Sequence, residues 1–310
     1  MRVATAFAPA HVTGFFSIHD QNDDPLYKGS RGAGFSLEKG VVTHIKIEEA
    51  QKQEITILFN GSSIDGPVTR TVIENILGLV NEKNYRIIVE HKSEFNIGTG
   101  FGLSAAGALS TALALTKALD IHMAITEIGQ IAHKAEIANK TGLGDVIAEI
   151  YGGFEIRKVY GGPGVGVLDF IPYPRDLTMV AAVFGPISTK SVLTDPHKRR
   201  KITLIGDKLV DKLLEHPTVE YFLQLSQNFA KQSGLITQEI SRYLDLLKKR
   251  GITASMIMIG NAVFTLTREE DVEYIKRSFL EVTGSRGKII VSRLLPTGVF
   301  LIDKKNTDIH

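Results

Sequence analysis

Three glycines at alternate positions precede an Ala- and Leu-rich stretch in NIGTGFGLSAAGALSTALALTKALD, which begins at residue 96. Because glycine lacks a Cβ, such a loop lets backbone N–H groups approach a bound group closely. The Ala and Leu residues have high helix propensity, so a helix is expected to begin near Leu103 with its positive end facing the same group. This arrangement binds phosphate, and Ser104 in the first turn could bond a phosphate oxygen or a metal ion.

Other kinds of loop share some of these features. A P-loop needs a Gly-Lys-Ser/Thr sequence, and this loop contains no Lys. A dinucleotide-binding loop needs a third Gly at position 103, which is Leu, and a strand that runs directly into the glycines. Here several polar residues, including Ser93 and Asn96, come between the expected strand and Gly98. A turn that caps a core helix is also compatible with the loop taken by itself.

The glycine-rich segment resembles the phosphate-binding motif of the GHMP kinases (galacto-, homoserine, mevalonate and phosphomevalonate kinases), Pro-x-Gly-x-Gly-Leu-Gly-Ser-Ser-Ala-Ala. The chain has Asn96 at the Pro, Phe101 at the Leu and Leu103 at the first Ser, so Ser104 is the one hydroxyl that remains. The resemblance implies ATP as the cofactor, bound at Gly98, Thr99, Gly100, Phe101, Gly102, Ser104 and Ala105.

Residues 135–154, AEIANKTGLGDVIAEIYGGF, resemble the segment in which these kinases carry a Glu, a loop of small residues, an Asp and Gly-Gly. The resemblance implies that Glu136 and Ser104 bind Mg²⁺ and that Asp145 orients or deprotonates the acceptor hydroxyl, so the three would be the catalytic residues. Phosphoryl transfer needs such a division of labour between a cation-binding group and a nucleophile-facing group. Taken alone, Glu136 could be an exposed helical residue and Asp145 a helix cap.

The segment FAPAHVTGFFSI, residues 7–18, occupies the place of the first family motif, Pro-Gly-Lys followed by Gly-Glu. Pro9 matches, His11 stands at the Lys, and the Gly-Glu is missing. Together with GSRGAGFSLEKGVVTHI at 29–45, this departure resembles the archaeal pantoate kinases, which make 4-phosphopantoate for coenzyme A synthesis. The alternatives are a GHMP-type kinase for homoserine, mevalonate or shikimate, and a non-catalytic module that senses a nucleotide or metabolite.

Pantoate, the small-molecule substrate that this resemblance implies, presents a carboxylate, a secondary hydroxyl, two geminal methyls and a primary alcohol. A carboxylate held away from water needs a cation, preferably a guanidinium, and either Arg31 or Arg157 could supply it. The methyls call for apolar cover, for which Val12, Phe15 and Phe16 are candidates, although these are equally ordinary core residues. The complete set of candidate substrate-binding residues is Ser30, Arg31, His133, Arg157, Thr189 and His11.

The pattern of apolar residues predicts the elements that must position these groups. In the first half it predicts a mixture of strands and helices. The strands are expected at 41–49, 54–59 and 85–92, and the helices at 68–83, from Leu103 and from near Thr126. In the second half it predicts a strand at 178–184, helices at 198–214, 217–233 and 236–250, a strand–turn–strand at 255–267, a helix at 269–281 and strands at 288–293 and 299–303.

These elements predict an α+β protein of two domains, and a turn cluster at 161–166 suggests a boundary near residue 172. The resemblance implies the GHMP kinase fold, with an N-terminal phosphate-binding α/β domain at 1–172 and a C-terminal ferredoxin-like α+β domain at 173–310. The third family motif, a glycine-rich loop that would support the active site from the second domain, is reduced to Ile259, Gly260, Asn261 and Ala262.

Composition excludes several classes of protein. The 310 residues include no Cys, so a disulfide framework, a thiolate nucleophile and an iron–sulfur cluster are ruled out. The 36 basic and 34 acidic residues give a net charge of +2, which does not indicate a nucleic-acid or membrane partner. Neither a secretory signal nor a run of about 18 apolar residues is present. We therefore expect a cytoplasmic enzyme, with a homodimer through strand edges as a possibility.

Overall fold

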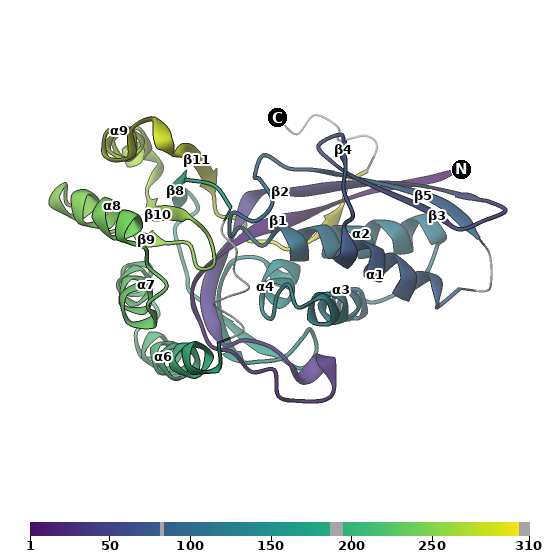
Figure 1. Cartoon of the computed structure of the whole chain (residues 1–310), viewed down its shortest axis with the longest axis horizontal. Coiled ribbons are helices and arrows are strands. Elements are labelled where there is room, and N and C mark those ends of the chain that lie inside the picture. Colours follow the sequence, from purple (N-terminus) through teal and green to yellow (C-terminus); the bar gives the residue numbers. More distant parts are fainter. Residues whose placement is uncertain (81–83, 187–194, 304–310) are drawn as a thin grey trace.

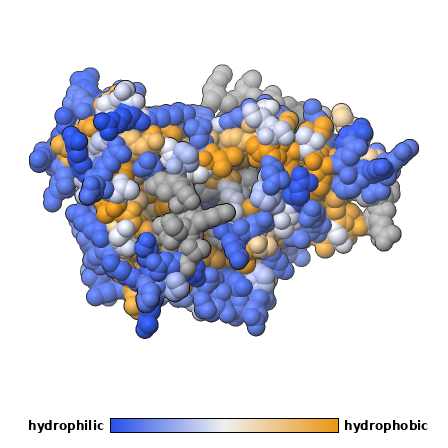
Figure 2. Space-filling model, viewed as in Figure 1, coloured by the Kyte–Doolittle hydropathy of each residue, from blue (hydrophilic) through white to orange (hydrophobic). Residues whose placement is uncertain are grey.

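The computed structural model describes residues 1–80, 84–186 and 195–303. Within this part of the chain the strands form two sheets, of eight and four strands, with helices packed on both (Figure 1). The face seen in Figure 2 is mostly hydrophilic, and its apolar residues gather in separate patches.

The eight-stranded sheet is mixed. Its strands are β1 (Arg2–Phe16), β2 (Gly32–Glu49), β3 (Glu54–Phe59), β4 (Ser62–Ser63), β5 (Tyr85–Lys92), β6 (Phe154–Val159), β7 (Val167–Phe170) and β12 (Phe300–Leu301). The main path runs β12-β1-β2-β5-β3-β4, and β6 pairs with the first part of β2 and with β7. Only the β3–β5 pair is parallel among these pairings.

Four helices cover one face of this sheet: α1 (Pro67–Leu77), α2 (Leu103–Leu119), α3 (Ile125–Asn139) and α4 (Asp145–Tyr151) (Figure 1). Helix α2 lies in the middle, where its small Ala residues allow strands and helices to pack closely from several sides. The N-terminal end of α2, with half-buried Leu103 and exposed Ser104, is therefore held at a fixed place in the fold, and so is the glycine loop that precedes it.

The four-stranded sheet is antiparallel, in the order β11-β8-β10-β9. Its strands are β8 (Thr178–Val183), β9 (Ser255–Met256), β10 (Ala262–Thr267) and β11 (Lys288–Arg293), and its helices are α6 (Pro196–Glu215), α7 (Val219–Ser233), α8 (Gln238–Lys249) and α9 (Val272–Thr283). Helices α6 and α7 begin with side-chain caps, from Asp195 and Thr218 respectively.

Strand β1 connects the two halves of the molecule. Its first half packs under α2, whereas Phe15 and Phe16 at its end pack against Phe229 of α7. The pairing of β1 with β2 shifts register between Pro9 and His11 and again between Thr13 and Phe15. Such irregularities re-aim side chains, and here they turn the segment around His11 toward the glycine loop, whose Phe101 carbonyl accepts a 3.0 Å hydrogen bond from the His11 N–H.

The α+β class with two sheets is confirmed. The strands predicted at 54–59 and 85–92 are β3 and β5 with the same bounds, and 41–49 is the second part of β2. Strands β2 and β3 do not pair with each other, because β5 lies between them. The helix predicted at 68–83 ends at Leu77, where Gly78 follows.

One predicted strand belongs to the other half of the molecule. We expected 299–303 in the C-terminal domain, but β12 pairs with β1, with Leu301 opposite Ala6, so that assignment was wrong. The change from one sheet to the other falls between β7 and β8. We retain residue 172 as the proposed boundary between the two domains. The last strand, β12, returns to the sheet of the first domain.

Candidate active site

A cavity of about 1060 Å³ lies where the glycine loop meets the first residues of α4. Its wall includes Thr13 of β1, Arg157 of β6 and the turn between β9 and β10 as well as parts of α1, α2 and α3. Ser104, Glu136 and Asp145 all line it. The three expected catalytic residues, which lie far apart in the sequence, are therefore brought to one cavity.

The glycine loop adopts a backbone that side chains would disfavour. Gly98, Gly100 and Gly102 have φ of 81°, 89° and 67°, in the left-handed region. A Cβ on Gly100 would also lie 2.8 Å from the Cα of Gly260, in the turn between β9 and β10. The degenerate third motif thus supports the loop from the second sheet through a contact between two glycine backbones.

Helix α2 begins directly after this loop, and Gly102 at its N-cap offers no side chain to satisfy the first N–H groups. Its first turn also lacks an acidic residue. The open N–H groups and the positive end of the helix dipole make this end of the cavity suitable for phosphate. Of the residues expected to bind ATP, five line the cavity: Gly98, Gly100, Phe101, Gly102 and Ser104.

The other two expected ATP-binding residues have side chains engaged elsewhere. The hydroxyl of Thr99 donates a 2.6 Å hydrogen bond to the carbonyl of Asn96, so it holds the loop in shape. Ala105 is buried in the core around α2. Contributions of these two residues to ATP binding would come from their backbone.

Glu136 lies on α3 and is buried beneath the cavity wall. Its Oε1 accepts hydrogen bonds from the hydroxyl of Ser104, at 2.5 Å, and from that of Thr141, at 2.8 Å. Burial raises the pKa of Glu136 to about 7 despite these two donors. A cation beside the carboxylate would favour its ionised form, so the site is suited to gaining a positive charge.

Asp145 is the first residue of α4 and lies across Gly142 from Glu136. A Cβ on Gly142 would lie 2.3 Å from Oε2 of Glu136 and 3.6 Å from Oδ2 of Asp145, so the glycine lets the two acids share this corner. The side chain of Asp145 is 32% exposed. Partial burial would raise its pKa, but the hydrogen bond and charge of His11, with smaller effects of Arg157, lower the pKa below its ordinary value.

His11 stands behind Asp145. Its Nδ1 is 3.2 Å from Oδ1 of Asp145 and its Nε2 is 2.9 Å from Oε1 of Glu155. Burial alone would lower the pKa of this imidazole, but the two carboxylates raise it to about 9. His11 is therefore charged at neutral pH and donates from both nitrogens. It was expected to bind substrate, whereas both of its nitrogens here face protein carboxylates.

Arg157 and Ser30 both lie next to Gly144, the residue that precedes Asp145. The Arg157 side chain is buried, and its Nη1 donates a 2.5 Å hydrogen bond to Oε1 of Glu155. Its Nε has no hydrogen-bond partner in the described part of the chain. A Cβ on Gly144 would lie 3.0 Å from this Nε and 2.1 Å from Oγ of Ser30, so a buried cation and a hydroxyl adjoin each other on the cavity wall.

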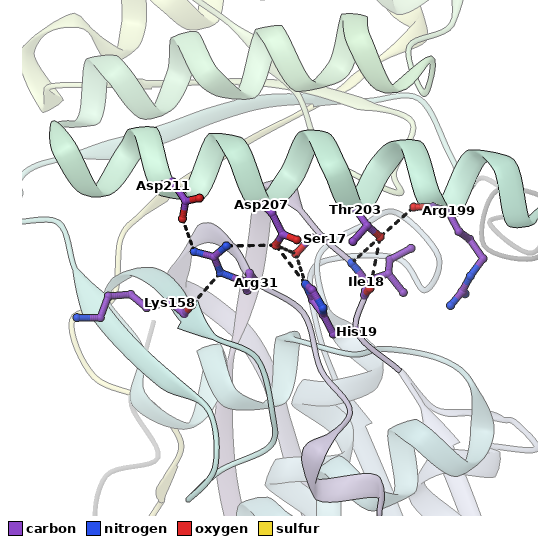
Figure 3. Close-up of polar contacts among 9 residues, drawn as sticks. All are labelled: Ser17, Ile18, His19, Arg31, Lys158, Arg199, Thr203, Asp207 and Asp211. Atoms are coloured by element: carbon purple, nitrogen blue, oxygen red, sulfur yellow. Dashed lines mark hydrogen bonds and ion pairs between the residues drawn. The ribbon is translucent and has the colours of Figure 1, made fainter. Parts of the chain in front are cut away.

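Arg31, the other arginine expected to hold a carboxylate, is directed toward α6 (Figure 3). Its guanidinium lies 2.6 Å from a carboxylate oxygen of Asp211 and 3.3 Å from one of Asp207, and its Nε donates to the carbonyl of Lys158 at 2.8 Å. The same Asp207 accepts a hydrogen bond from Ser17 at 2.7 Å. Arg31 therefore joins α6 to the ends of β1 and β2, away from the cavity.

The remaining sequence candidates are distributed as follows. His133 on α3 has its Nε2 within 3.1 Å of the carbonyl oxygens of both Pro25 and Lys28, so it holds the 3₁₀ turn at Pro25–Tyr27 and does not line the cavity. Burial, partly offset by those carbonyls, lowers the pKa of His133. Thr189 lies outside the described residues. Phe16 lines the cavity, whereas Val12 and Phe15 are fully buried in the core.

Two buried acids at the site were not among the sequence candidates. Glu155 alternates with Phe154 and Ile156 on β6, and Glu149 follows Asp145 by one turn on α4. A signal for Glu155 was available, because two charged residues at alternate positions in an apolar strand share one face. Neither oxygen of Glu149 has a hydrogen-bond partner in the described part of the chain, and burial raises its pKa well above the ordinary value.

Comparisons with known proteins identify relatives of this chain. The family model of the GHMP kinases N-terminal domain matches residues 68–153. The pantoate kinase of Thermococcus kodakarensis is 37% identical over 281 residues, which cover 88% of this chain and 90% of that protein. The pantoate kinase of Methanocaldococcus jannaschii is 34% identical over 267 residues, which cover 86% and 94%.

Solved structures with the same fold include two kinds of phosphotransferase. A phosphotransferase described as related to the coenzyme A biosynthesis pathway matches with a TM-score of 0.86 and 31% identity, covering 97% of this chain and 98% of that one. A homoserine kinase from Cytophaga hutchinsonii matches with a TM-score of 0.73 and 17% identity, covering 97% and 98%, which indicates a shared fold alone.

The chain therefore belongs to the GHMP kinases, which use ATP to phosphorylate small molecules. Within that class, the relatives that extend over nearly its whole length place it in the pantoate kinase family. In the described ranges, every helix is too short or too polar to cross a lipid bilayer.

Proposed function

We propose that this chain transfers the γ-phosphoryl group of ATP to the primary hydroxyl of pantoate, which gives 4-phosphopantoate in archaeal coenzyme A biosynthesis. The observation that carries this proposal is that Arg157, a buried cation, lines the same cavity as Ser30 and the glycine loop. Two pantoate kinases are similar to this chain over nearly its whole length, which supports pantoate as the acceptor.

The glycine loop and the first turn of α2 would bind the phosphates. Their backbone N–H groups and the helix dipole are fixed before ATP arrives, so no reorganisation is needed at the moment of transfer. The hydroxyl of Ser104, exposed at this end of the cavity, would bond a phosphate oxygen once it leaves Glu136.

Ser104 and Glu136 fit a Mg²⁺ ion by their chemistry, because both offer oxygen to a hard cation. Among the described residues no three His, Asp or Glu side chains form a metal-binding group, so an ion at Ser104 and Glu136 would need phosphate oxygens and water as its other ligands. When bound, Mg²⁺ supplies positive charge to the β- and γ-phosphates.

At the acceptor end, Arg157 and Ser30 would bind the carboxylate of pantoate. A guanidinium is suited to this task because it is always charged and its donors are fixed in a plane. Phe16 and Met258, which also line the cavity, offer apolar cover for the two methyl groups. Asp145 lies beside this end, so the primary hydroxyl would face it.

Asp145 would align the hydroxyl with phosphorus and accept its proton as transfer proceeds. The charged His11 keeps Asp145 ionised, so its carboxylate can accept a proton. Its lowered pKa also makes it a weak base. The transition state of phosphoryl transfer is loose, so little proton abstraction is needed before the P–O bond breaks. Alignment is then the larger part of what Asp145 contributes.

A coupled assay of ADP release with pantoate, homoserine, mevalonate and shikimate as acceptors tests the proposal. We expect ATP- and Mg²⁺-dependent turnover with pantoate and far lower kcat/KM with the others. Turnover with another acceptor alone would favour a different GHMP-type kinase. Nucleotide binding without turnover of any acceptor would favour the sensor alternative, and either result would overturn the proposal.

A further inference from the structure

Four buried or partly buried groups form a chain of alternating charge between the two ends of the acceptor site. Asp145, His11, Glu155 and Arg157 follow one another at 3.2, 2.9 and 2.5 Å, measured between the hydrogen-bonding atoms. The side chains of His11 and Glu155 are both fully buried. One oxygen of Glu155, Oε1, accepts from both His11 and Arg157.

The strand geometry explains why these groups can meet. On β6, Glu155 and Arg157 point to the same face and lie opposite Gly34 and Gly32 of β2. A Cβ on Gly34 would lie 2.6 Å from Nε2 of His11, and one on Gly32 would lie 2.6 Å from Nη2 of Arg157. The two glycines therefore leave the space that the charged chain occupies.

Burial makes the chain interdependent. A buried charge is costly unless it is paired, so His11 and Arg157 both need the carboxylate of Glu155. A neutral imidazole has one donor and one acceptor, and its acceptor nitrogen would then face a carboxylate. Glu155 thus favours the form of His11 that donates to Asp145 as well.

We propose that Glu155 is a positioning residue that couples the binding of the acceptor's anionic group at Arg157 to the alignment of Asp145 through His11. This inference rests on the proposed function. Glu155 is buried and is not among the residues that line the cavity. It fixes the direction of Arg157 on one side and the charge of His11 on the other. An acceptor anion bound by Arg157, which lines the cavity, would stand at one end of a chain that ends at the catalytic carboxylate.

The variant Glu155→Gln tests this coupling, because the amide keeps the shape and removes the charge. We expect the KM for pantoate to rise and kcat to fall, each by about tenfold, because charge-assisted hydrogen bonds to His11 and Arg157 are weakened. The KM for ATP should stay within about twofold of the unmodified enzyme, since the glycine loop is untouched. A variant with kcat and both KM values unchanged would overturn the inference.

The pH profile of kcat gives a readout that a purely structural role would not move. The charged groups that contact the His11 ring are Asp145 of α4 and Glu155 of β6, and Arg157 contacts the same Glu155. Glu149 of α4 lies near the Cβ of His11, on the other side of Gly102. In the unmodified enzyme the basic limb should lie near pH 9, where His11 loses its proton. Without the Glu155 charge, burial dominates, so the basic limb should move to lower pH. An unshifted basic limb would contradict the inference.

Glu149→Gln is the matched control, because Glu149 is a buried acid of the same region without a hydrogen bond to His11 or Arg157 in the described part of the chain. It should leave the pH profile of kcat unchanged, and an equal shift in both variants would overturn the inference. If Glu155→Gln does not fold, ¹⁵N NMR of the His11 ring in the unmodified protein at pH 7.5 decides. Two protonated nitrogens support the inference, and a neutral ring overturns it.

Failure of the inference and failure of the proposed function give different results. If the unmodified protein does not phosphorylate pantoate, the proposed function is wrong. If it does, and Glu155→Gln has the same kcat, KM for pantoate and pH profile, only the positioning role of Glu155 is wrong.

Discussion

At the scale of single residues, the site is built from pairs whose environments push their pKa values apart. Burial raises the pKa of Glu136 to about 7, whereas the charged His11 lowers that of Asp145. Of these two carboxylates, Glu136 would therefore be protonated first as the pH falls, and Asp145 would stay ionised. This difference gives the two carboxylates different tasks, one suited to receiving a cation and the other to facing a hydroxyl.

Asp145→Asn should lower kcat by roughly 10² or more, because an amide neither aligns the acceptor hydroxyl as a carboxylate does nor accepts its proton. The KM for ATP should change little, since Asp145 is on the acceptor side of the cavity. Steady-state kinetics measure both. Asp169→Asn, an exposed acid of β7 paired with Lys158, is the control and should retain full activity. Full turnover by Asp145→Asn would refute its role.

Glu136→Ala should raise the Mg²⁺ concentration for half-maximal velocity by roughly tenfold or more, since it removes the carboxylate that bonds Ser104. A Mg²⁺ titration at saturating ATP and pantoate measures the effect. The exposed Lys134 of the same helix supplies a control in Lys134→Ala. An unaltered Mg²⁺ dependence in Glu136→Ala would mean that the ion, if bound, lies elsewhere.

Sequence reasoning at this scale identified residue types better than their partners. Arg31 and Arg157 were equivalent candidates, and only the fold turns Arg31 toward α6 and buries Arg157 in the cavity wall. Likewise, His11 could be recognised as standing at the Lys of the family motif, but its contact with Glu155 depends on a pairing between β2 and β6. Such long-range pairings leave no local signal.

At the scale of elements, the glycine loop was the most predictable feature, because positive φ and an Ala-rich helix both follow from residue type. Its support by Gly260 was predicted in position, and the contact between Gly100 and Gly260 adds the reason that both are glycine. The strand β1 was less predictable. Its irregular pairing and the burial of both faces conceal the alternation by which half-buried strands are recognised.

Gly100→Ala tests the loop. The added Cβ would clash with Gly260 and shift the loop from its support, so the KM for ATP should rise roughly ten- to a hundredfold. Gly61→Ala is a matched control, because Gly61 has a similar φ of 81° and nothing within 4 Å of its Cβ position. It carries the backbone strain without the clash. Equal KM values for ATP in the two variants would contradict the role of the Gly100–Gly260 contact.

His91 holds three elements together next to the loop. Its Nδ1 lies 2.8 Å from the hydroxyl of Thr43 on β2, and its Nε2 lies 3.1 Å from that of Thr69 on α1. Ser110 of α2 bonds the same Thr43 hydroxyl at 2.6 Å. Burial lowers the pKa of His91 to about 4, so this imidazole is neutral in the folded protein.

This arrangement predicts acid sensitivity. In the unfolded chain His91 becomes protonated below about pH 6.5, whereas in the folded protein it stays neutral down to about pH 4. The free energy of unfolding therefore falls as the pH drops through this window. Between pH 7 and pH 5 the loss due to His91 should be about 2 kcal/mol. Urea unfolding of the unmodified protein and of His91→Gln at both pH values measures it. The variant should lose less stability by that amount, and identical losses would argue against a neutral buried His91.

At the scale of the whole molecule, the active site depends on the junction of the two sheets. Strand β1 and the turn between β9 and β10 come from different sheets, and the Met258 N–H donates to the carbonyl of Thr13 at 3.2 Å across that junction. The two-domain α+β fold could be predicted from element types and from the family resemblance. The return of β12 to β1 could not, because a two-residue strand has no periodicity.

The most direct test of the account is the crystal structure of the chain with a non-hydrolysable ATP analogue, Mg²⁺ and pantoate. The account predicts the triphosphate at the N-terminus of α2, the pantoate carboxylate on Arg157, and the primary hydroxyl between Asp145 and the γ-phosphate. Pantoate bound with its primary hydroxyl away from Asp145, or a triphosphate outside the glycine loop, would contradict it.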